Sequence, residues 1–364
     1  MIRKIIKLLF LSVTIISIFL LLLSPLAWYV SPHRTSIFSF IGLAFPVILT
    51  SNIVCLVAWL LLKERKVALV IGIALILCYK PITTFFPLNI KRQTVPENSL
   101  KVLSYNVMGF LRESKKESAH PLLEYIAKTD ADIVCLQEYM ISKTGKTLLT
   151  QSDVDKILNK YPYRSITGLE YSGKYHTYGL ACFSKYPIKK THEFTFKSSY
   201  NGSAIYTLDV DGEDYLVLNN HLESNKISSS DKKLYSNFLT KRNYPTAVEV
   251  GSNIKKRMGR GYTKRASQVQ QLSDYINRQA YDKLIVCGDF NDMPISYAYN
   301  RMKGNLTDAY TSTGFGAGIT YYEHLFLFRI DYILHSKNLK AHKTKIDRVK
   351  YSDHYPVLTY LTEQ

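Results

Sequence analysis

The stretch that decides the fold of this chain is KLIVCGDFNDMP, from Lys283 to Pro294. Its apolar run, Leu284 to Cys287, predicts a strand buried in the core. Asp289, Asn291 and Asp292 follow that run almost at once. A polar residue after a strand is usually part of a turn and bonds to its own backbone. Whether these three residues form a site therefore depends on what the other strands carry at their ends.

Six apolar runs of the chain carry a carboxylate, an amide or an imidazole near one end. These runs alternate with helical stretches such as KRASQVQQLSDYINRQA. The pattern predicts an α/β or α+β sandwich with helices packed on the outside of sheets. Polar residues gathered at strand ends on a rigid scaffold are typical of a functional site. The polar residues at the ends of these runs are Asn106, Gln137, Glu138, Asn219, Asn220, His221, Asp289, Asn291, Asp331, Asp353 and His354.

The oxygen atoms of this set favour a hard divalent cation. Glu138, Asp289, Asp353 and Asn106 offer carboxylate and amide oxygens, which suit Mg²⁺, Mn²⁺ or Ca²⁺. The Cys and His spacings match no zinc site, and the five cysteines are interpreted as small buried apolar residues. The sequence therefore predicts a site for Mg²⁺ or Mn²⁺ as the cofactor.

The imidazoles of the set are His221 and His354. An imidazolium neutralises the charge that grows on phosphate oxygens, and a neighbouring carboxylate keeps it protonated and oriented. Asp331 is the candidate for that carboxylate. A further carboxylate beside the phosphate can deprotonate the attacking water. Cation, base and imidazolium together predict metal-assisted hydrolysis of a phosphate ester.

Taken in order, the motifs resemble those of the endonuclease/exonuclease/phosphatase superfamily over about residues 100–362. That superfamily includes type I deoxyribonuclease-like enzymes, abasic-site endonucleases, inositol-polyphosphate phosphatases and neutral sphingomyelinases. The resemblance implies a four-layer fold of two stacked mixed β-sheets flanked by helices, with the site at one edge of the sandwich. The motifs are SYNV, DIVCLQE, YGLACFSKYPI, NNHLES, VCGDFND, RIDYIL and YSDHYPV.

The resemblance also implies roles for the motif residues. An aspartate orients or activates the water beside a helping asparagine, one histidine contacts the scissile phosphate, and a carboxylate–imidazole pair stabilises the transition state. In this chain these are Asp289, Asn291, His221, and Asp331 with His354. The resemblance assigns the metal site to Asn106, Glu138 and Asp353. Every motif position is filled by the expected residue type, which argues against a non-catalytic binding protein that merely keeps the fold.

Residues 1–90 are far more apolar than the rest and predict a membrane anchor. Ile5 to Leu23 contains one Lys and is long enough to cross a bilayer. A cleaved signal peptide is the alternative, but no small-x-small site follows. Three transmembrane helices are predicted, at about 5–26, 37–62 and 67–88, although Lys80 and Pro81 interrupt the third. Residues 91–99 predict a linker, and 100–364 the catalytic domain.

The charges beside these segments predict an orientation. Arg3, Lys4 and Lys7 precede the first segment, and Lys63 to Lys66 read KERK after the second. Because basic residues favour the cytoplasmic side, three spans place the domain outside, in the periplasm or beyond the plasma membrane. If the third segment only lies on the membrane, the domain is cytoplasmic instead.

The identity of the substrate stays open between nucleic acid, a phospholipid or sphingolipid head group, and a small phosphate ester. The net charge of +18 favours anionic partners. The polar segment from Asn225 to about Thr263 is either a basic groove for substrate or lipid, or a solvated insertion. Lys174 and His176 are candidates for substrate contact, against an ordinary aromatic turn, and Asn220 is a third candidate. No protein partner is predicted.

Overall fold

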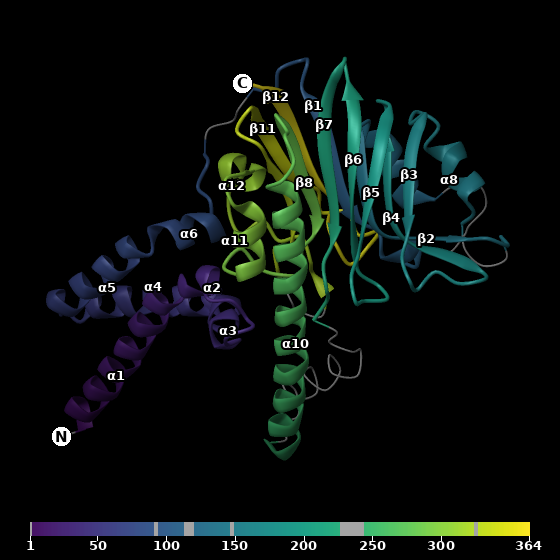
Figure 1. Cartoon of the computed structure of the whole chain (residues 1–364). Coiled ribbons are helices and arrows are strands. Elements are labelled where there is room, and N and C mark those ends of the chain that lie inside the picture. Colours follow the sequence, from purple (N-terminus) through teal and green to yellow (C-terminus); the bar gives the residue numbers. More distant parts are fainter. Residues whose placement is uncertain (1, 91–93, 113–119, 146–148, 226–243, 324–326) are drawn as a thin grey trace.

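The computed structural model describes residues 2–90, 94–112, 120–145, 149–225, 244–323 and 327–364. Residues from 100 onward form two six-stranded β-sheets (Figure 1). The first sheet contains β1 (Leu100–Asn106), β2 (Ile133–Ser142), β3 (Tyr163–Gly168), β4 (His176–Ser184), β11 (Leu339–Ile346) and β12 (Val357–Glu363). The second contains β5 (Ile188–Thr195), β6 (Gly202–Val210), β7 (Glu213–His221), β8 (Lys283–Asp289), β9 (Thr307–Asp308) and β10 (Asp331–His335).

Both sheets are mixed. Their strand orders are β11-β12-β1-β2-β4-β3 and β5-β6-β7-β8-β10-β9. The pairs β1–β2 and β7–β8 are parallel, and the other pairs are antiparallel. The first strand of the domain pairs with the last, since Leu100 lies opposite Leu361.

The main core lies between the two sheets. Cys135, Cys182 and Cys287 come from three different strands, are fully buried there and carry free thiols. They pack as small apolar residues, as predicted. The core strands carry apolar residues on both faces because each sheet is covered twice, once by the other sheet and once by helices.

Helices cover the outer face of each sheet. The α7 (Pro121–Thr129) and α8 (Gln151–Ile157) helices pack on the first sheet, and α10 (Tyr244–Ile276) and α11 (Tyr297–Lys303) pack on the second. The short η1 (Met108–Phe110) and α12 (Ala309–Thr313) complete the domain. The predicted fold, two stacked mixed sheets flanked by helices, is confirmed. The second half of the polar segment that follows Asn225 is part of α10, while residues 226–243 lie outside the described residues.

The apolar N-terminal part is less regular than predicted. It contains α1 (Ile2–Leu23), α2 (Leu26–Tyr29), α3 (Ile37–Leu43), α4 (Phe45–Leu61), α5 (Arg65–Leu77) and α6 (Tyr79–Phe85). Among the described residues, one helix, Ile2–Tyr29, is long and apolar enough to cross a membrane. The other two predicted spans are bent pairs, by 60° between α3 and α4 and by 66° between α5 and α6.

The bends have a local cause. Pro46 and Pro81 stand in the first turn of α4 and α6, where a missing backbone N–H is tolerated but the preceding helix cannot continue straight. The described part of the chain therefore has one helix that could span a membrane, or up to three spans if each bent pair counts as one span. The prediction of three straight transmembrane helices is corrected accordingly.

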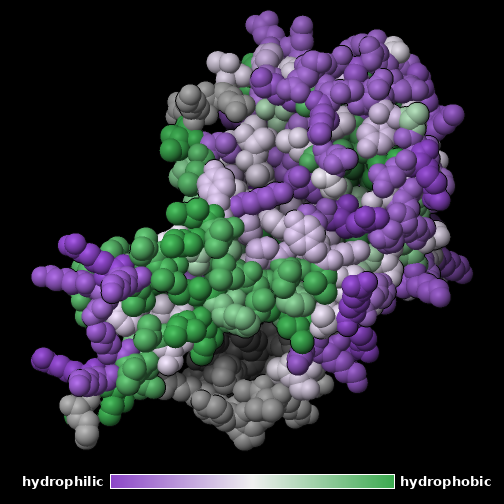
Figure 2. Space-filling view, turned by 60° about the vertical axis from the view of Figure 1, so that its left-hand side comes forward, coloured by the Kyte–Doolittle hydropathy of each residue, from purple (hydrophilic) through white to green (hydrophobic). Residues whose placement is uncertain are grey.

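The N-terminal helices pack directly on the domain (Figure 1). The indole Nε1 of Trp28 donates a hydrogen bond to the carbonyl oxygen of Pro294, 2.8 Å away. A Cβ placed on Gly42 would lie 2.0 Å from the carbonyl oxygen of Ile295, so α3 needs glycine there to approach so closely. Arg329 of the domain donates a hydrogen bond to the carbonyl oxygen of Thr84 in α6. The space-filling view shows the resulting apolar surface running up to the polar domain (Figure 2).

Candidate active site

The strand register brings the polar strand ends together. His221, the last residue of β7, lies opposite Asp289, the last residue of β8, and Asp289 in turn lies opposite Asp331, the first residue of β10. Residues opposite each other in a sheet project their side chains to the same face. Three of the predicted residues therefore become neighbours through hydrogen bonding of the backbone alone.

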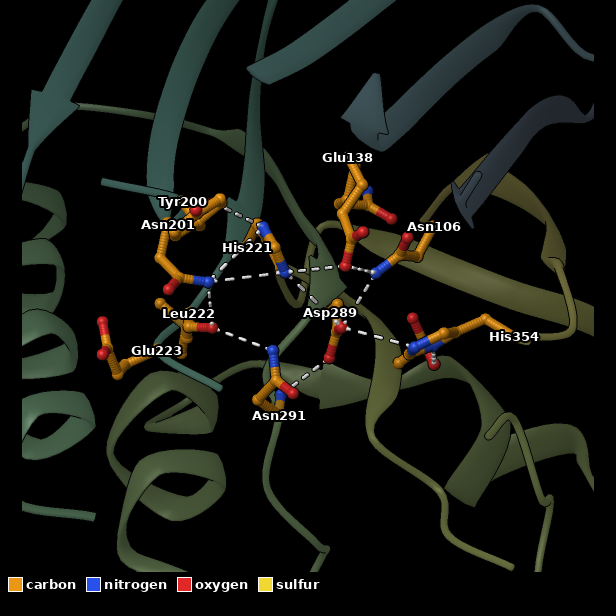
Figure 3. Close-up of polar contacts among 12 residues, drawn as sticks. Asn106, Glu138, Tyr200, Asn201, His221, Leu222, Glu223, Asp289, Asn291 and His354 are labelled. Carbon is orange, nitrogen blue, oxygen red and sulfur yellow. Dashed lines mark hydrogen bonds and ion pairs between the residues drawn. The ribbon is translucent and has the colours of Figure 1, made fainter. Parts of the chain in front are cut away.

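The other sheet adds Asn106 and Glu138 (Figure 3). The pairing of β2 shifts register between Leu136 and Tyr139, and Glu138 in that irregularity has a φ of 53°. The bulge redirects its carboxylate toward the strand ends. Asn106 Nδ2 donates to Glu138 Oε1 at 3.0 Å and to Asp289 Oδ2 at 3.1 Å. One amide thus joins carboxylates from both sheets.

His354 and Asp331 form a buried pair. His354 Nδ1 lies 2.8 Å from Asp331 Oδ2, and His354 Nε2 lies 3.7 Å from Asp289 Oδ2. Burial opposes the charged ring, but the carboxylates of Asp331 and Asp289 outweigh it and hold the pKa of His354 well above its usual value. Tyr321 packs edge-on against the imidazole, with ring centroids 5.0 Å apart. His354 is therefore a fixed imidazolium at neutral pH.

His221 is the opposite kind of imidazole. Its Nε2 lies 3.5 Å from Glu138 Oε1 and 3.9 Å from Asp289 Oδ2, and its Nδ1 lies 3.1 Å from the carbonyl oxygen of Tyr200. Burial lowers the pKa of His221 and exceeds the effect of the nearby Asp289. The site therefore holds one neutral and one cationic ring.

Asp289 stands at the centre of the cluster. Burial, reinforced by repulsion from Asp331, raises its pKa to about 6. The backbone N–H of Asn291 donates to Asp289 Oδ1 at 2.7 Å, and Asn291 Nδ2 donates to the carbonyl oxygen of Leu222 at 2.9 Å. Gly288 has a φ of 123°, and a Cβ there would lie 2.0 Å from the backbone oxygen of Asn220. The GDFN motif needs its glycine to turn this carboxylate into the site.

Asp292 fixes the GDFN motif through a contact with α10. Its Oδ2 accepts a hydrogen bond from Arg265 Nε at 3.1 Å, and the fully buried Arg265 also donates to the carbonyl oxygen of Glu223 at 2.7 Å and to Asn225 Oδ1 at 2.9 Å. Arg265 lies in α10, so the helix holds the loop that follows β8.

The donors fit a hard divalent cation. Glu138, Asp289 and Asp353 line one cleft with His354, and the amide of Asn106 reaches two of these carboxylates. Burial and repulsion by Asp353 raise the pKa of Glu138, as expected where a positive ion is needed to balance clustered carboxylates. Asp289, Asp331 and His354 also offer atoms within 4.8 Å of one another. The neighbouring carboxylates raise the pKa of His354 and favour its charged form, so the oxygen atoms are the better ligands for a hard divalent cation.

Three predicted substrate residues lie away from the lining of this cleft. Asn220 Oδ1 accepts from Ser203 Oγ at 2.8 Å within the second sheet. His176 contacts the carbonyl oxygen of Tyr171, 3.0 Å from its Nε2, and Lys174 lies over the ring of Tyr175. Their part in substrate binding stays a prediction.

Several cleft residues have no sequence signal that marks them. Tyr321 follows no regular pattern, and Leu43 is one apolar residue among many in the N-terminal part. Both residues line the cleft together with members of the predicted cluster. Asn201, whose Nδ2 lies within 3.5 Å of the His221 ring, is likewise an isolated polar residue in the sequence.

Comparison with known families agrees with this geometry. The model of the Endonuclease/Exonuclease/phosphatase family matches residues 103–354. The chain belongs to this family. Its members hydrolyse phosphate esters, so the endonuclease/exonuclease/phosphatase domain of this chain is a hydrolase of that class. A second family model, described as a domain of unknown function, matches residues 4–85. No curated protein matches the chain.

Solved structures share the fold of this endonuclease/exonuclease/phosphatase domain. A family protein from Leptotrichia buccalis has a TM-score of 0.51 at 19% identity, covering 72% of this chain and 99% of that one. One from Beutenbergia cavernae has a TM-score of 0.50 at 16% identity and covers 73% and 72%. The human Nocturnin catalytic domain, solved with bound sulfate, has a TM-score of 0.50 at 18% identity and covers 76% and 96%.

Proposed function

We propose that the chain is a membrane-anchored phosphodiesterase that depends on Mg²⁺ or Mn²⁺. The observation that carries the proposal is the His354–Asp331 pair facing Asp289 Oδ2 across 3.7 Å in one cleft. An imidazolium for phosphate oxygens and a carboxylate for water then lie on either side of one small volume. Asn106, Glu138 and Asp353 would hold the cation, which supplies charge to the phosphate.

The protein's own groups account for the proton movements. Asp289 accepts a proton from the attacking water, and a pKa near 6 suits that task at neutral pH. The water oxygen forms a bond to phosphorus as the bond to the leaving oxygen breaks, and that oxygen takes a proton from solvent. His354 donates to the phosphate oxygens, where charge grows. His221 donates from Nδ1 to the carbonyl oxygen of Tyr200, which leaves Nε2 as an acceptor beside Glu138 and Asp289, while Asn291 holds Asp289 in place.

The catalytic test uses the full-length protein in detergent with bis(p-nitrophenyl) phosphate and Mn²⁺. We expect hydrolysis that EDTA abolishes and that His354→Ala lowers by about three orders of magnitude or more, since one charged group at the phosphate is lost. His342→Ala is the matched control, because His342 bonds to Thr362 Oγ1 at 2.8 Å outside the cleft. Full activity of His354→Ala, or activity in EDTA, would refute the mechanism.

The anchor proposal has separate support. Lys7 pairs with Glu64, so the N-terminus and the KERK turn lie at one end of the helices, and Trp28 and Thr84 contact the domain at the other. With basic residues on the cytoplasmic side, the domain lies outside. Protease shaving of intact spheroplasts should remove the C-terminal domain. A protected domain would reverse the orientation.

A further inference from the structure

One wall of the catalytic cleft belongs to the N-terminal segment. The cleft has a volume of about 240 Å³, and Leu43, the last residue of α3, lines it together with Asp289 and His354. Tyr262 of α10 lines it too and packs edge-on against Phe40 of α3, with ring centroids 5.4 Å apart. The apolar segment and the hydrolase domain therefore enclose the same space.

This wall is fixed in position. Backbone contact at Gly42 and the Trp28 hydrogen bond hold α2 and α3 against Pro294 and Ile295, directly after the motif that carries Asp289. Ile295 is fully buried in an apolar cluster with residues of α1 and α4. Leu43 is thus held beside the reacting groups by close packing.

The lining of the cleft is mixed in polarity. It includes acidic groups and His354. It also includes apolar or aromatic residues, namely Leu43, Tyr262, Met293, Phe328 and Ile330. A lining that combines these two kinds of residue suits a phosphate carried by an apolar body.

Positive charge lies instead beside the apolar segment. A groove of about 590 Å³ runs between Ser36, the residue before α3, and the basic face of α10. The cations that line it are Lys255, Lys256, Arg260 and Lys264. Clusters of Lys and Arg directly next to a membrane segment attract anionic lipid head groups. A basic groove beside the apolar segment is therefore suited to bind lipid phosphates.

We infer that the substrate is a membrane phospholipid whose phosphodiester binds beside Asp289 and His354 while its apolar part lies along Leu43. This inference rests on the proposed phosphodiesterase function. Water adds across one P–O bond, giving a phosphomonoester and an alcohol. Leu43 is then a residue that determines specificity, and it is contributed by the membrane anchor.

The test compares each phospholipid with its own deacylated head group. Full-length protein in mixed micelles is given phosphatidylcholine, phosphatidylethanolamine or phosphatidylglycerol, or the corresponding glycerophosphodiester, with Mn²⁺. We expect kcat/KM for a lipid to exceed that for its deacylated partner by about tenfold or more, the usual effect of a filled apolar pocket. Leu43→Asn should reduce that ratio about tenfold. Ile37→Asn, on the same helix and 62% exposed, should leave it unchanged.

Each contrary outcome has its own meaning. Equal hydrolysis of lipid and deacylated diester, or equal effects of the two variants, overturns the inference and leaves the phosphodiesterase intact. DNA or RNA cleaved faster than every lipid assigns the cleft to nucleic acid instead. Failure to cleave any diester, bis(p-nitrophenyl) phosphate included, overturns the proposed function together with the inference.

Discussion

Two histidines lie on either side of Asp289 and carry different charges. His354 has a carboxylate partner, Asp331, at 2.8 Å, whereas His221 faces the backbone oxygen of Tyr200. Because both imidazole rings are buried, the hydrogen-bond partner of each ring decides whether that ring is charged. One ring is therefore suited to stabilising negative charge at the phosphate, and the other to a neutral contact.

The variant Asp331→Asn tests this dependence. It keeps the size of the side chain and removes the charge that raises the pKa of His354. His354 then loses its proton at lower pH, so the alkaline limb of the kcat/KM profile should move to lower pH. We also expect kcat to fall about 10²- to 10⁴-fold at neutral pH. A reduced rate with an unmoved limb would make Asp331 merely structural.

Protons and the cation compete for the same carboxylates. In the metal-free site the pKa of Glu138, a proposed ligand, is raised, and that of Asp289, whose charge lies beside the cation site, is about 6. At lower pH protons neutralise the carboxylates that attract the cation, and at higher pH their charges are already present. Mn²⁺ should therefore bind about tenfold more weakly at pH 5 than at pH 7.5, measured by calorimetry. Equal affinity at both pH values would contradict this arrangement of ligands.

At the scale of elements, α10 both covers a sheet and holds the site. Its Val269, Leu272 and Ile276 pack on the second sheet, while Arg265 on the same helix reaches Asp292. The helix spans 33 residues, so its earlier part extends beyond the sheet toward the N-terminal segment. One continuous helix therefore connects the core, the catalytic loop and α3 (Figure 1).

Replacing Arg265 with Met should be strongly destabilising. It leaves the buried Asp292 without its partner, which costs about 3–5 kcal/mol of unfolding free energy. The pKa of Asp292 is raised by burial even with the arginine present, and it rises further without it. The unpaired carboxyl then takes up a proton in acid, so urea unfolding should show a smaller loss at pH 5 than at pH 8.

Arg164→Met is the control for that comparison. Arg164 pairs with Asp155 at 3.1 Å, but both side chains are partly exposed, at 43% and 32%. Such a pair contributes about 1 kcal/mol or less. Comparable losses in the two variants, or a loss in Arg265→Met that does not vary with pH, would show that Asp292 is not held by charge.

At the scale of the whole molecule, the N-terminal helices and the domain pack as one body. Gly42→Leu places a side chain where the backbone of Ile295 lies, 2.0 Å from the Cβ position. Overpacking of this kind costs about 1–3 kcal/mol. We expect a lower Tm and a change in Trp28 fluorescence. Gly72→Leu is the control, since nothing lies within 4 Å of its Cβ position. An unchanged Tm in Gly42→Leu would mean that the contact is dispensable.

The sequence predicts the local parts of this molecule well and the assembly of those parts poorly. GDFN, NNH and SDH stand at strand ends because each strand is a short apolar run, and the parallel and antiparallel register then brings them together. Nothing comparable marks Leu43, because a residue that meets lipid and one that lines a cleft are equally apolar. The sequence marks Pro81 as an interruption of the third segment but gives no sign of the bend near Pro46, since length and hydropathy alone describe the second segment as a straight span.

The pairing of β1 with β12 has a consequence for how the protein is made. Leu100 is the first residue of the domain's first strand, and its partner, Leu361, belongs to β12, the last strand of the same sheet in chain order. A chain synthesised from its N-terminus must keep that side of β1 unpaired until β12 has been made. Long-range pairing of this kind folds slowly and leaves a strand edge open to aggregation. The first sheet is therefore complete only after β12 has been synthesised, and loss of β12 should affect biogenesis before it affects chemistry.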